Sequence, residues 1–495
     1  MTMEPHLALD GDFYLPARRG LVELIGWLRE ARVDHTAMEV ELAARGERLA
    51  RELYQGWLDE LSHAEEREHA RAPLLDGVTY RSYTRQIENG FGRVVLRRLG
   101  HEVAGQPVRF PLDRQLNLPA DLYSHPLRRR VLEEAHDRAW DRSVERVEHT
   151  TGGHVPKRQA QGLALKATQD FEEFYKQRAA PQVMGESTLL LGSSDCKGIR
   201  MLPDGLREAT KKAAAAETAE AVRGDPMAPK KLRSHDKRMA VVTAVWEQEA
   251  VPRQASDIVS ELHRTSEGRK ARNKGPRPQN KRVSASVEKT VSMGVSEMFD
   301  EFDHRDPKRV RTVGILVDGE ENQQTAILTE GRLRGRGLIL VLDIIHVIHY
   351  LWLAGFALCH KKRKATDTWV TTHLRMLLSS PIALVIASIE AAAAQKLSAS
   401  ERKSVNKALG YLRRNAPFLD YTTYLARGLP IATGIIEGAC RHLIQDRLGI
   451  TGARWSLRGA EAMLRLRSLH SSGDWDDYWR FHLKQEAVRN YAAAA

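Results

Sequence analysis

Five short apolar runs, three of which lead to an aspartate, are the feature that most restricts the fold of this 495-residue chain. The runs are Leu189–Leu191, Met239–Trp246, Val283–Val287, Val313–Val317 and Leu338–Leu342. Short runs of this composition, bounded by polar segments, are typical of buried β-strands. Helical periodicity separates the third run from the fourth and the fourth from the fifth. We therefore expect three consecutive strands, followed by two strands that are each preceded by a helix.

This order of elements predicts the architecture of residues 185–343. Consecutive strands pair as an antiparallel set, whereas strands joined through a helix run parallel with right-handed crossovers. Three strands, helix, strand, helix and strand is the order of an RNase H-like fold. We therefore predict a mixed α and β protein (α+β) whose RNase H-like core has its first part in 185–343.

The segment after this core is almost wholly helical. We expect an all-α insertion from 344 to 430, and we expect residues 431–495 to complete the core with a helix and a C-terminal tail. The most apolar stretch, Leu338–Cys359, contains Asp343 and His346. Because such side chains are unfavourable in lipid, we expect a buried strand and helix there, and no membrane partner.

Residues 1–184 are predicted to form a mainly helical N-terminal DNA-binding region with one β-hairpin. Within 80–103, β-forming residues flank Asn89-Gly90, which is a strong turn signal. Within 131–167 we expect a helix, a glycine-containing turn and a second helix, the layout of a helix-turn-helix. Lys157 and Arg158, at the start of the second helix, are then candidates for DNA contact. A plain helical hairpin is the alternative.

Charge and cysteine content favour an intracellular protein with a polyanionic partner. The formal net charge is +12, while 42% hydrophobic residues are enough for large cores. The segment 263–282 is strongly basic, which favours phosphate contacts over a purely solvated loop. Its candidate DNA-binding residues are Arg269, Lys270, Arg272 and Lys274. The three cysteines are far apart, which excludes a disulfide framework and favours the cytoplasm.

Carboxylates near the predicted strand ends indicate metal-dependent phosphodiester chemistry. Enzymes that cut and rejoin DNA often use two divalent ions about 3.5–4 Å apart, and Mg²⁺ or Mn²⁺ prefers carboxylate oxygens. Asp195 ends the first predicted strand, Asp318 ends the fourth, and Glu437 lies at the start of a late helix. We expect these three residues to be catalytic and to hold two Mg²⁺ or Mn²⁺ ions.

Asp343, after the fifth predicted strand, is the alternative to Asp318. In the expected sheet the fourth strand lies beside the first at about 4.8 Å, and the fifth lies one strand further away. A two-ion site fits the nearer pair, Asp195 and Asp318, so we expect Asp343 to be a helix N-cap. The alternative role of Asp318 is that of a turn aspartate before Gly319. His346 is expected to be a core histidine, with an orienting role as its alternative.

Several motifs strengthen this prediction. The C-terminal run from Pro430 to Leu443 contains Glu437 and is followed by Asp446-Arg447 and 451–456; upstream stand Val317-Asp318-Gly319 and Asp343-Ile-Ile-His346. These motifs resemble the ISKra-type family of insertion-sequence transposases, over roughly 80–485. The resemblance implies a DDE transposase with an RNase H-like catalytic domain and a helical insertion before Glu437. Cys196 and His349 depart from the family pattern.

The resemblance also implies the reaction and the partners. The reaction is metal-dependent cleavage at insertion-sequence ends, followed by transfer of the 3′ ends to target DNA. The partners are double-stranded DNA (transposon ends and target) and further copies, as a homodimer or larger, in a bacterial cytoplasm near the nucleoid. A nuclease that does not join, or a non-catalytic DNA-binding protein on the same scaffold, is the alternative.

Three residues near the late helix are further candidates for DNA contact. Arg441 lies one helical turn after Glu437 and would share its face, so it is placed to contact a phosphate. Arg454 and Trp455 follow, with Trp455 expected to stack on a base. The alternatives are a surface arginine at 441 and core packing of the tryptophan.

Overall fold

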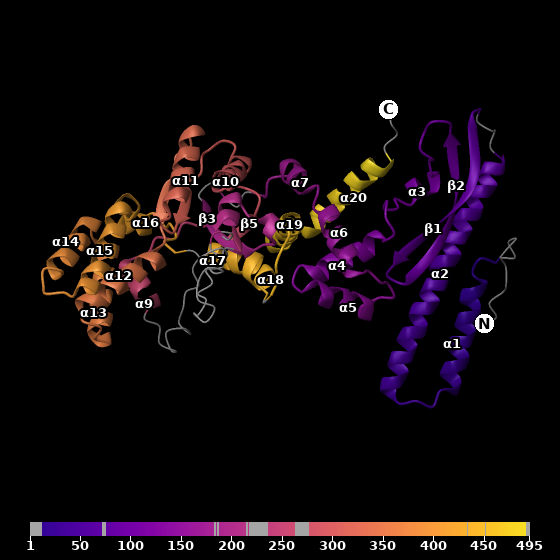
Figure 1. Cartoon of the computed structure of the whole chain (residues 1–495), viewed down its shortest axis with the longest axis horizontal. Helices are drawn as coiled ribbons and strands as arrows, with labels where there is room; N and C mark the ends of the chain where they lie inside the picture. Colours follow the sequence, from indigo (N-terminus) through magenta and orange to yellow (C-terminus); the bar gives the residue numbers. More distant parts are fainter. Residues whose placement is uncertain are drawn as a thin grey trace. The chain divides into compact units, whose positions relative to one another are not determined.

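The computed structural model of the chain describes residues 12–71, 76–182, 185, 188–213, 216, 236–262, 277–432, 434–450 and 452–491 (Figure 1). They form a mixed α and β protein with two compact units. Unit 1 takes its residues from 1–174 and 476–495, and unit 2 from 175–475. Across the described residues, no helix is both long and apolar enough to span a membrane.

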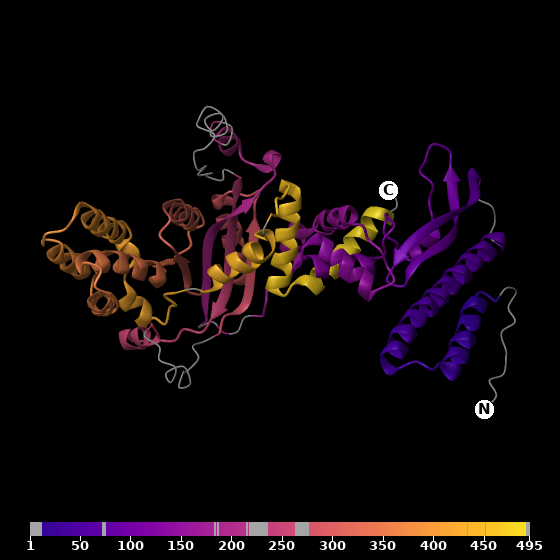
Figure 2. The same ribbon diagram turned by 60° about the horizontal axis from the view of Figure 1, so that its bottom comes forward.

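A mixed five-stranded sheet lies at the centre of unit 2 (Figure 2). Its strands are β3 (Leu189–Arg200), β4 (Lys237–Gln248), β5 (Gln279–Ser286), β6 (Val313–Val317) and β7 (Ile339–Leu342). Their order in the sheet is β5-β4-β3-β6-β7. The pairs β3–β4 and β4–β5 are antiparallel, and β3–β6 and β6–β7 are parallel. All five predicted runs are therefore confirmed as strands.

Helix α10 (Val291–Arg305) packs closely on one face of this sheet. A Cβ at Gly192 of β3 would lie 2.6 Å from the Phe302 ring, and a Cβ at Gly294 would lie 2.8 Å from Val241. Successive side chains of a strand point to opposite faces. Asp195, an odd number of residues from Gly192, therefore points to the face opposite α10. Helix α11 (Glu321–Leu333) follows β6 and contacts α10.

Helices follow the sheet, as the sequence predicts. They are α12 (Ile344–Leu358), α13 (Arg363–Ser379), α14 (Ile382–Ala392), α15 (Ala399–Arg414) and α16 (Tyr421–Ala426). After them come α17 (Gly434–Ala439), a π-helical turn (Cys440–Gln445), α18 (Asp446–Leu448) and α19 (Leu457–Ser472). Unit 2 also contains α9 (Ala255–Leu262) and two 3₁₀ turns, Pro203–Gly205 and Ala416–Phe418. Leu338–Cys359, the most apolar stretch, forms β7 and α12.

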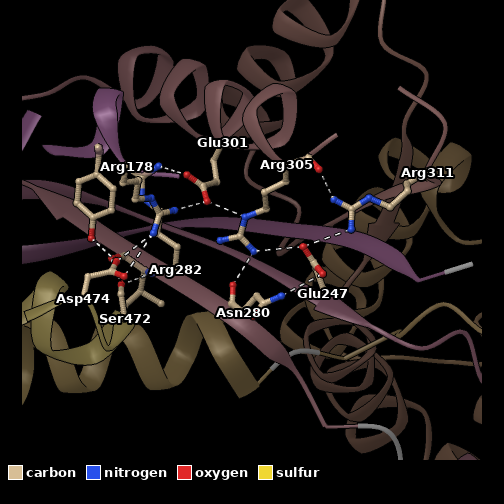
Figure 3. A network of polar contacts seen from close by, with 11 residues as sticks. Arg178, Glu247, Asn280, Arg282, Glu301, Arg305, Arg311, Ser472 and Asp474 are labelled. Atoms are coloured by element: carbon tan, nitrogen blue, oxygen red, sulfur yellow. Dashed lines mark hydrogen bonds and ion pairs between the residues drawn. The ribbon is translucent and has the colours of Figure 1, made fainter. Parts of the chain in front are cut away.

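A network of buried ion pairs crosses unit 2 beside β4 and β5 (Figure 3). Glu301 of α10 pairs with Arg178, Arg282 and Arg305, and all four side chains are at most 14% exposed. Glu247 of β4 pairs with Arg311 at 3.2 Å. Each buried charge in this network therefore has an opposite charge beside it, as burial requires.

Unit 1 begins with two long helices and a hairpin. Its elements are α1 (Leu15–Glu30), α2 (His35–Arg71), β1 (Val78–Asn89), β2 (Gly92–Val103), α3 (Pro111–Gln115), α4 (His125–Ala135), α5 (Trp140–Thr150), α6 (Lys157–Ala167) and, at the boundary with unit 2, α7 (Phe171–Gln177). The hairpin is confirmed, but Asn89 pairs with Gly92, so the turn residues are Gly90 and Phe91 rather than Asn89-Gly90. The Asn89 side chain accepts the Phe91 N–H at 2.7 Å, which stabilises the shifted turn.

The predicted helix-turn-helix segment is more divided than the sequence indicates. Helices α4 and α5 both precede α6, where one helix was expected from Val131. The three helices share an apolar core that includes Val131, Val147 and Leu163. The segment Gly152–Pro156 separates α5 from α6, so the glycine-containing turn lies where the sequence predicts it.

The sequence predicts that residues 431–495 complete the core of unit 2. The C-terminal helix α20 (Trp475–Tyr491) instead belongs almost wholly to unit 1. The Tyr478 hydroxyl donates to the Ala167 carbonyl at 2.6 Å, and His482 contacts Asp170 at 2.6 Å. Both partners belong to unit 1. The N-terminal part of this unit extends to residue 174, whereas the sequence predicts a boundary at 184. Helical periodicity alone does not distinguish which core a terminal helix joins.

Candidate functional site

The three predicted catalytic carboxylates line a single pocket in unit 2. Asp195 comes from β3, Asp318 from the residue after β6, and Glu437 from α17. The lining also includes Asp343 and His346 from the start of α12. Residues separated by more than a hundred positions in the sequence therefore meet at one place.

Asp195 lies in the middle of β3, whereas the sequence led us to expect it at a strand end. Strand β3 continues to Arg200 because it pairs with β4 along its whole length. Its pairing with β6 stops at Ser193↔Leu316, so Asp195 lies just beyond the point where β6 ends. The Oδ1 atom accepts the Cys196 N–H at 2.6 Å, and Oδ2 accepts the Cys440 thiol at 3.2 Å.

Asp318 is half-buried in the turn that follows β6. Its Oδ1 accepts the Glu320 N–H at 2.9 Å, so it also has the turn role named as its alternative. Gly319 has φ +94°, and a Cβ there would lie 2.8 Å from the Tyr411 ring, which only glycine tolerates. Burial raises the pKa of Asp318, and the negative charge of Asp195 raises it further. The hydrogen bond from the Glu320 N–H lowers this pKa but does not cancel the rise. The two carboxylates are therefore close enough to interact.

Three tyrosines from the helical segment hold the ends of β6 and β7, and the sequence did not reveal them. The Tyr411 hydroxyl donates to the Asp318 carbonyl at 2.8 Å. Tyr421 and Tyr424 donate to the carbonyls of Leu342 and Leu340 at 2.8 and 3.0 Å. The only sequence signal is three tyrosines within one short stretch, which does not indicate their acceptors. These hydrogen bonds connect the helices to the edge of the sheet where the pocket opens.

Asp343 is buried and caps α12. Its side chain accepts the Ile345 N–H at 2.8 Å, which confirms the predicted N-cap role. The prediction of a core histidine at 346 is wrong, because His346 is exposed and lines the pocket. Helix α12 begins at the pocket, so its first turn faces the carboxylates.

Glu437 is exposed in α17, and the helix widens directly after it. Residues Cys440–Gln445 form the π-helical turn, an irregularity that is frequent at functional sites. The turn places Cys440 against Asp195. Burial, followed by the charge of Asp195, raises the pKa of the Cys440 thiol well above its usual value, so the thiol stays protonated and remains a donor. No sequence signal indicates this contact.

The chemistry of the pocket suits hard divalent cations. Carboxylate oxygens are the ligands that Mg²⁺ and Mn²⁺ prefer, and a cation beside Asp195 and Asp318 would offset the repulsion between the two carboxylates. In the described part of the chain, no three His, Cys, Asp or Glu side chains converge closely enough to hold an ion as they stand. Asp195, Asp318 and Glu437 are the carboxylates on the pocket lining that a two-ion site would use, and Glu437 is exposed.

The predicted DNA contacts outside the pocket have different outcomes. Lys157 and Arg158 are exposed at the start of α6, where Lys157 pairs with Asp141 at 2.7 Å. Arg441 is exposed and pairs with Asp446 at 3.4 Å. The residues Arg269, Lys270, Arg272 and Lys274 lie outside the described residues.

Trp455 does not present its ring to solvent. It is 6% exposed, its Nε1 donates to the Leu448 carbonyl at 3.3 Å, and its backbone pairs with the end of β3 at Met201. The predicted stacking on a DNA base is therefore wrong, and core packing explains this residue. Its neighbour Arg454 is exposed.

No known protein family and no curated protein matches this chain. The inference about its function therefore rests on the pocket and on the order of the strands.

Proposed function

We propose that the chain is a DDE transposase of an insertion sequence, a mobile DNA element. It would cleave the element's ends and transfer the 3′ ends to target DNA in a metal-dependent reaction. The observation that supports this most strongly is the meeting of Asp195, Asp318 and Glu437 around one pocket. Two aspartates and a glutamate, from two adjacent strands and a later helix, supply the carboxylate oxygens that divalent ions prefer.

The sheet also supports an RNase H-like core. Three antiparallel strands are followed by two parallel strands in the order β5-β4-β3-β6-β7. This is the order expected for that fold from the succession of elements in the sequence. Asp318 follows the strand next to β3, whereas Asp343 follows the strand beyond it. These relations favour Asp318 over Asp343 as the second catalytic carboxylate.

In the proposed mechanism Asp195 and Asp318 would hold the ions, and Glu437 would supply a further ligand. When bound, Mg²⁺ or Mn²⁺ would supply activation of the attacking water or 3′-hydroxyl and stabilisation of the leaving oxygen. The Cys440 thiol and the Cys196 N–H fix the orientation of the Asp195 carboxylate. No serine or tyrosine nucleophile is needed in this mechanism, because water and the 3′-hydroxyl attack phosphorus directly.

Double-stranded DNA is the proposed partner. The net charge of +12 favours a polyanion, and Lys157 and Arg158 are exposed at the start of a helix in a three-helix unit. Arg441 and Arg454, exposed near α17 and α19, are the proposed phosphate contacts in unit 2. A homodimer or larger assembly in the bacterial cytoplasm completes the proposal.

One observation favours the alternative, a DNA-binding protein on this scaffold that cuts without joining or does not cut. Both oxygens of Asp195 already accept hydrogen bonds within the protein. One comes from the backbone N–H of the adjacent Cys196, and the other comes from the thiol of Cys440. A metal ion would have to share these oxygens.

Cleavage and strand transfer on labelled DNA from the ends of the element test the proposal. Wild type, Asp318→Asn and Asp343→Asn are compared with Mg²⁺ or Mn²⁺. We expect wild type to cut and join, Asp318→Asn to bind DNA but do neither, and Asp343→Asn to retain both activities. Wild type that binds the ends and never cuts would support the non-catalytic alternative, and cutting without joining would support a nuclease.

A further inference from the structure

The helical hairpin made of α1 and α2 has almost no core of its own. Helix α1 buries only Ala17, and the three buried residues of α2 are Gly56, Leu58 and Ser62, all in its second half. Figure 1 shows α1 alongside the first half of α2. Isolated helices of this length are marginal in water, and most helices are stabilised by packing of an apolar face. The hairpin therefore lacks the packing that would stabilise it.

Both helices nevertheless have an apolar stripe. In α1, Leu21, Ile25 and Leu28 are spaced by four and three residues and are 39–46% exposed. In α2, Leu42, Leu53 and Trp57 continue one face at 38–47% exposure. The α1 spacings are those of the apolar seam in packed helices, whereas Leu42 and Leu53 lie on one face of α2 three turns apart.

The contacts between α1 and α2 show that the two stripes lie on the same side of the hairpin. Arg45 lies 4.4 Å from the Trp27 ring, and a Cβ at Gly20 would lie 3.7 Å from Leu49, so the helices are antiparallel with these positions facing each other. Successive residues of an α-helix are about 100° apart around its axis. In each helix the stripe therefore lies roughly 90° around the axis from the positions that face the other helix, and this angle has the same direction when each helix is followed from its N-terminus. In antiparallel helices, equal rotations in the same sense bring both stripes to one side.

The β-hairpin packs on the other side of α2 and reaches this side only at Trp57, which stacks on Tyr54 beside the hairpin core. Strand β2 contacts α2 through Gln55, whose amide donates to the Val95 carbonyl at 2.8 Å. On the helix, Gln55 points roughly 160° away from the stripe of Leu42 and Leu53. We call the six side chains of the two stripes the apolar face of the hairpin: Leu21, Ile25, Leu28, Leu42, Leu53 and Trp57.

The size of the apolar face matches that of a stable interface. At exposures of 38–47%, its six residues leave on the order of 450 Å² of mostly apolar surface in water. A standard interface buries about 800 Å² per partner, of which about 57% is apolar, and this also amounts to roughly 450 Å². A second hairpin of the same kind would supply an equal area with the same seam spacing.

We propose that the apolar face binds the same face of a second copy of this chain, so that two α1–α2 hairpins form a four-helix bundle. A two-fold arrangement places the same patch of each copy in contact and is the commonest way in which proteins form dimers. Four-helix bundles bury apolar stripes of this spacing in their centre. This assigns a surface to the homodimer of the proposed function, and to that extent it rests on that proposal.

The molar mass of the full chain, measured by sedimentation or light scattering in the absence of DNA and metal, tests this interface. The perturbing variants are Ile25→Lys and Leu53→Lys on the apolar face. The matched controls are Val40→Lys and Val488→Lys, whose valines are 64% and 59% exposed and lie off that face. Far-UV circular dichroism confirms that each variant remains helical.

We expect wild type at micromolar concentration to have twice the 55.8 kDa of one chain. Each lysine on the apolar face should raise the dimer dissociation constant at least about 100-fold, and the control variants should leave it unchanged. If a perturbing variant loses helix, Leu42→Gln replaces it as the milder change, with the same expected dissociation.

A monomeric wild type would overturn the proposal and leave the face for a different partner. The proposal would also be overturned if the variants on the apolar face and the control variants weakened the dimer equally, or if neither set weakened it. Another surface would then form the dimer. The assay contains no DNA, so its failure is distinct from a failure of the proposed transposase activity.

Discussion

Glu301 is the residue whose replacement tests the buried ion-pair network most directly. Its side chain is 2% exposed and pairs with Arg178, Arg282 and Arg305. Removing one member of a buried ion pair leaves the opposite charges without compensation, which typically costs about 3–5 kcal/mol. We expect Glu301→Gln to lower the free energy of unfolding of unit 2 by about this amount.

The same residue predicts a dependence on pH. Burial raises the pKa of Glu301, but the positive charges of Arg282, Arg305 and Arg178 outweigh burial and lower it to about 2. A glutamate in the unfolded chain titrates near pH 4.3, so the stabilisation is present above about pH 4.3 and is lost as the pH falls toward 2.

Urea and thermal unfolding, followed by circular dichroism, measure this effect. A fall in the melting midpoint on the order of 10 °C is expected for Glu301→Gln. Asp300→Asn, on the same helix, removes an ion pair with Arg334 at an aspartate that is 65% exposed, and should cost less than about 1 kcal/mol. Equal losses in the two variants, or a loss from Glu301→Gln that does not shrink below pH 4, would refute this reasoning.

Three further predictions concern single residues. Asp343→Ala removes the N-cap of α12 and should lower stability by about 1 kcal/mol, measured by urea unfolding, while Asp343→Asn should lose less. Trp455→Phe should leave the affinity for end DNA unchanged in a binding titration, because the ring is buried; a tenfold loss would restore the stacking role. Burial lowers the pKa of His482, but hydrogen bonds to Asp170 and Glu486 outweigh it and raise the pKa. Its charged form stabilises unit 1 below about pH 6.5, and this contribution is lost as the pH rises through the raised pKa. His482→Gln should therefore cost about 1–3 kcal/mol at pH 6 and less at pH 9, and equal losses would contradict this.

Features that depend on local pattern could be predicted from the sequence. Each of the five strands has a compact apolar run, and the spacing of these runs determines which strands are antiparallel. The meeting of Asp318 with Asp195 follows from this order, whereas Glu437 is indicated by the motif from Pro430 to Leu443 that contains it. The cap at Asp343 follows from its place immediately before α12.

Features that depend on long-range packing could not be predicted. The Cys440 thiol reaches Asp195 only because a π-helical turn follows Glu437. Trp455 is buried because its backbone pairs with the end of β3, and an isolated Arg-Trp-Ser segment gives no sign of this. Tyr411 contacts the carbonyl of a residue 93 positions away. The sequence places the six side chains of the apolar face on helices, but it does not show that they share one surface. That follows only from the antiparallel contacts between α1 and α2.

The most direct test of the central claim is to locate Mn²⁺ by its anomalous scattering in crystals of the chain bound to end DNA. The proposed mechanism predicts two peaks about 3.5–4 Å apart, in contact with Asp195 and Asp318 and near Glu437. Peaks that are absent from this pocket, or that contact Asp343 and leave Asp318 without an ion, would contradict it.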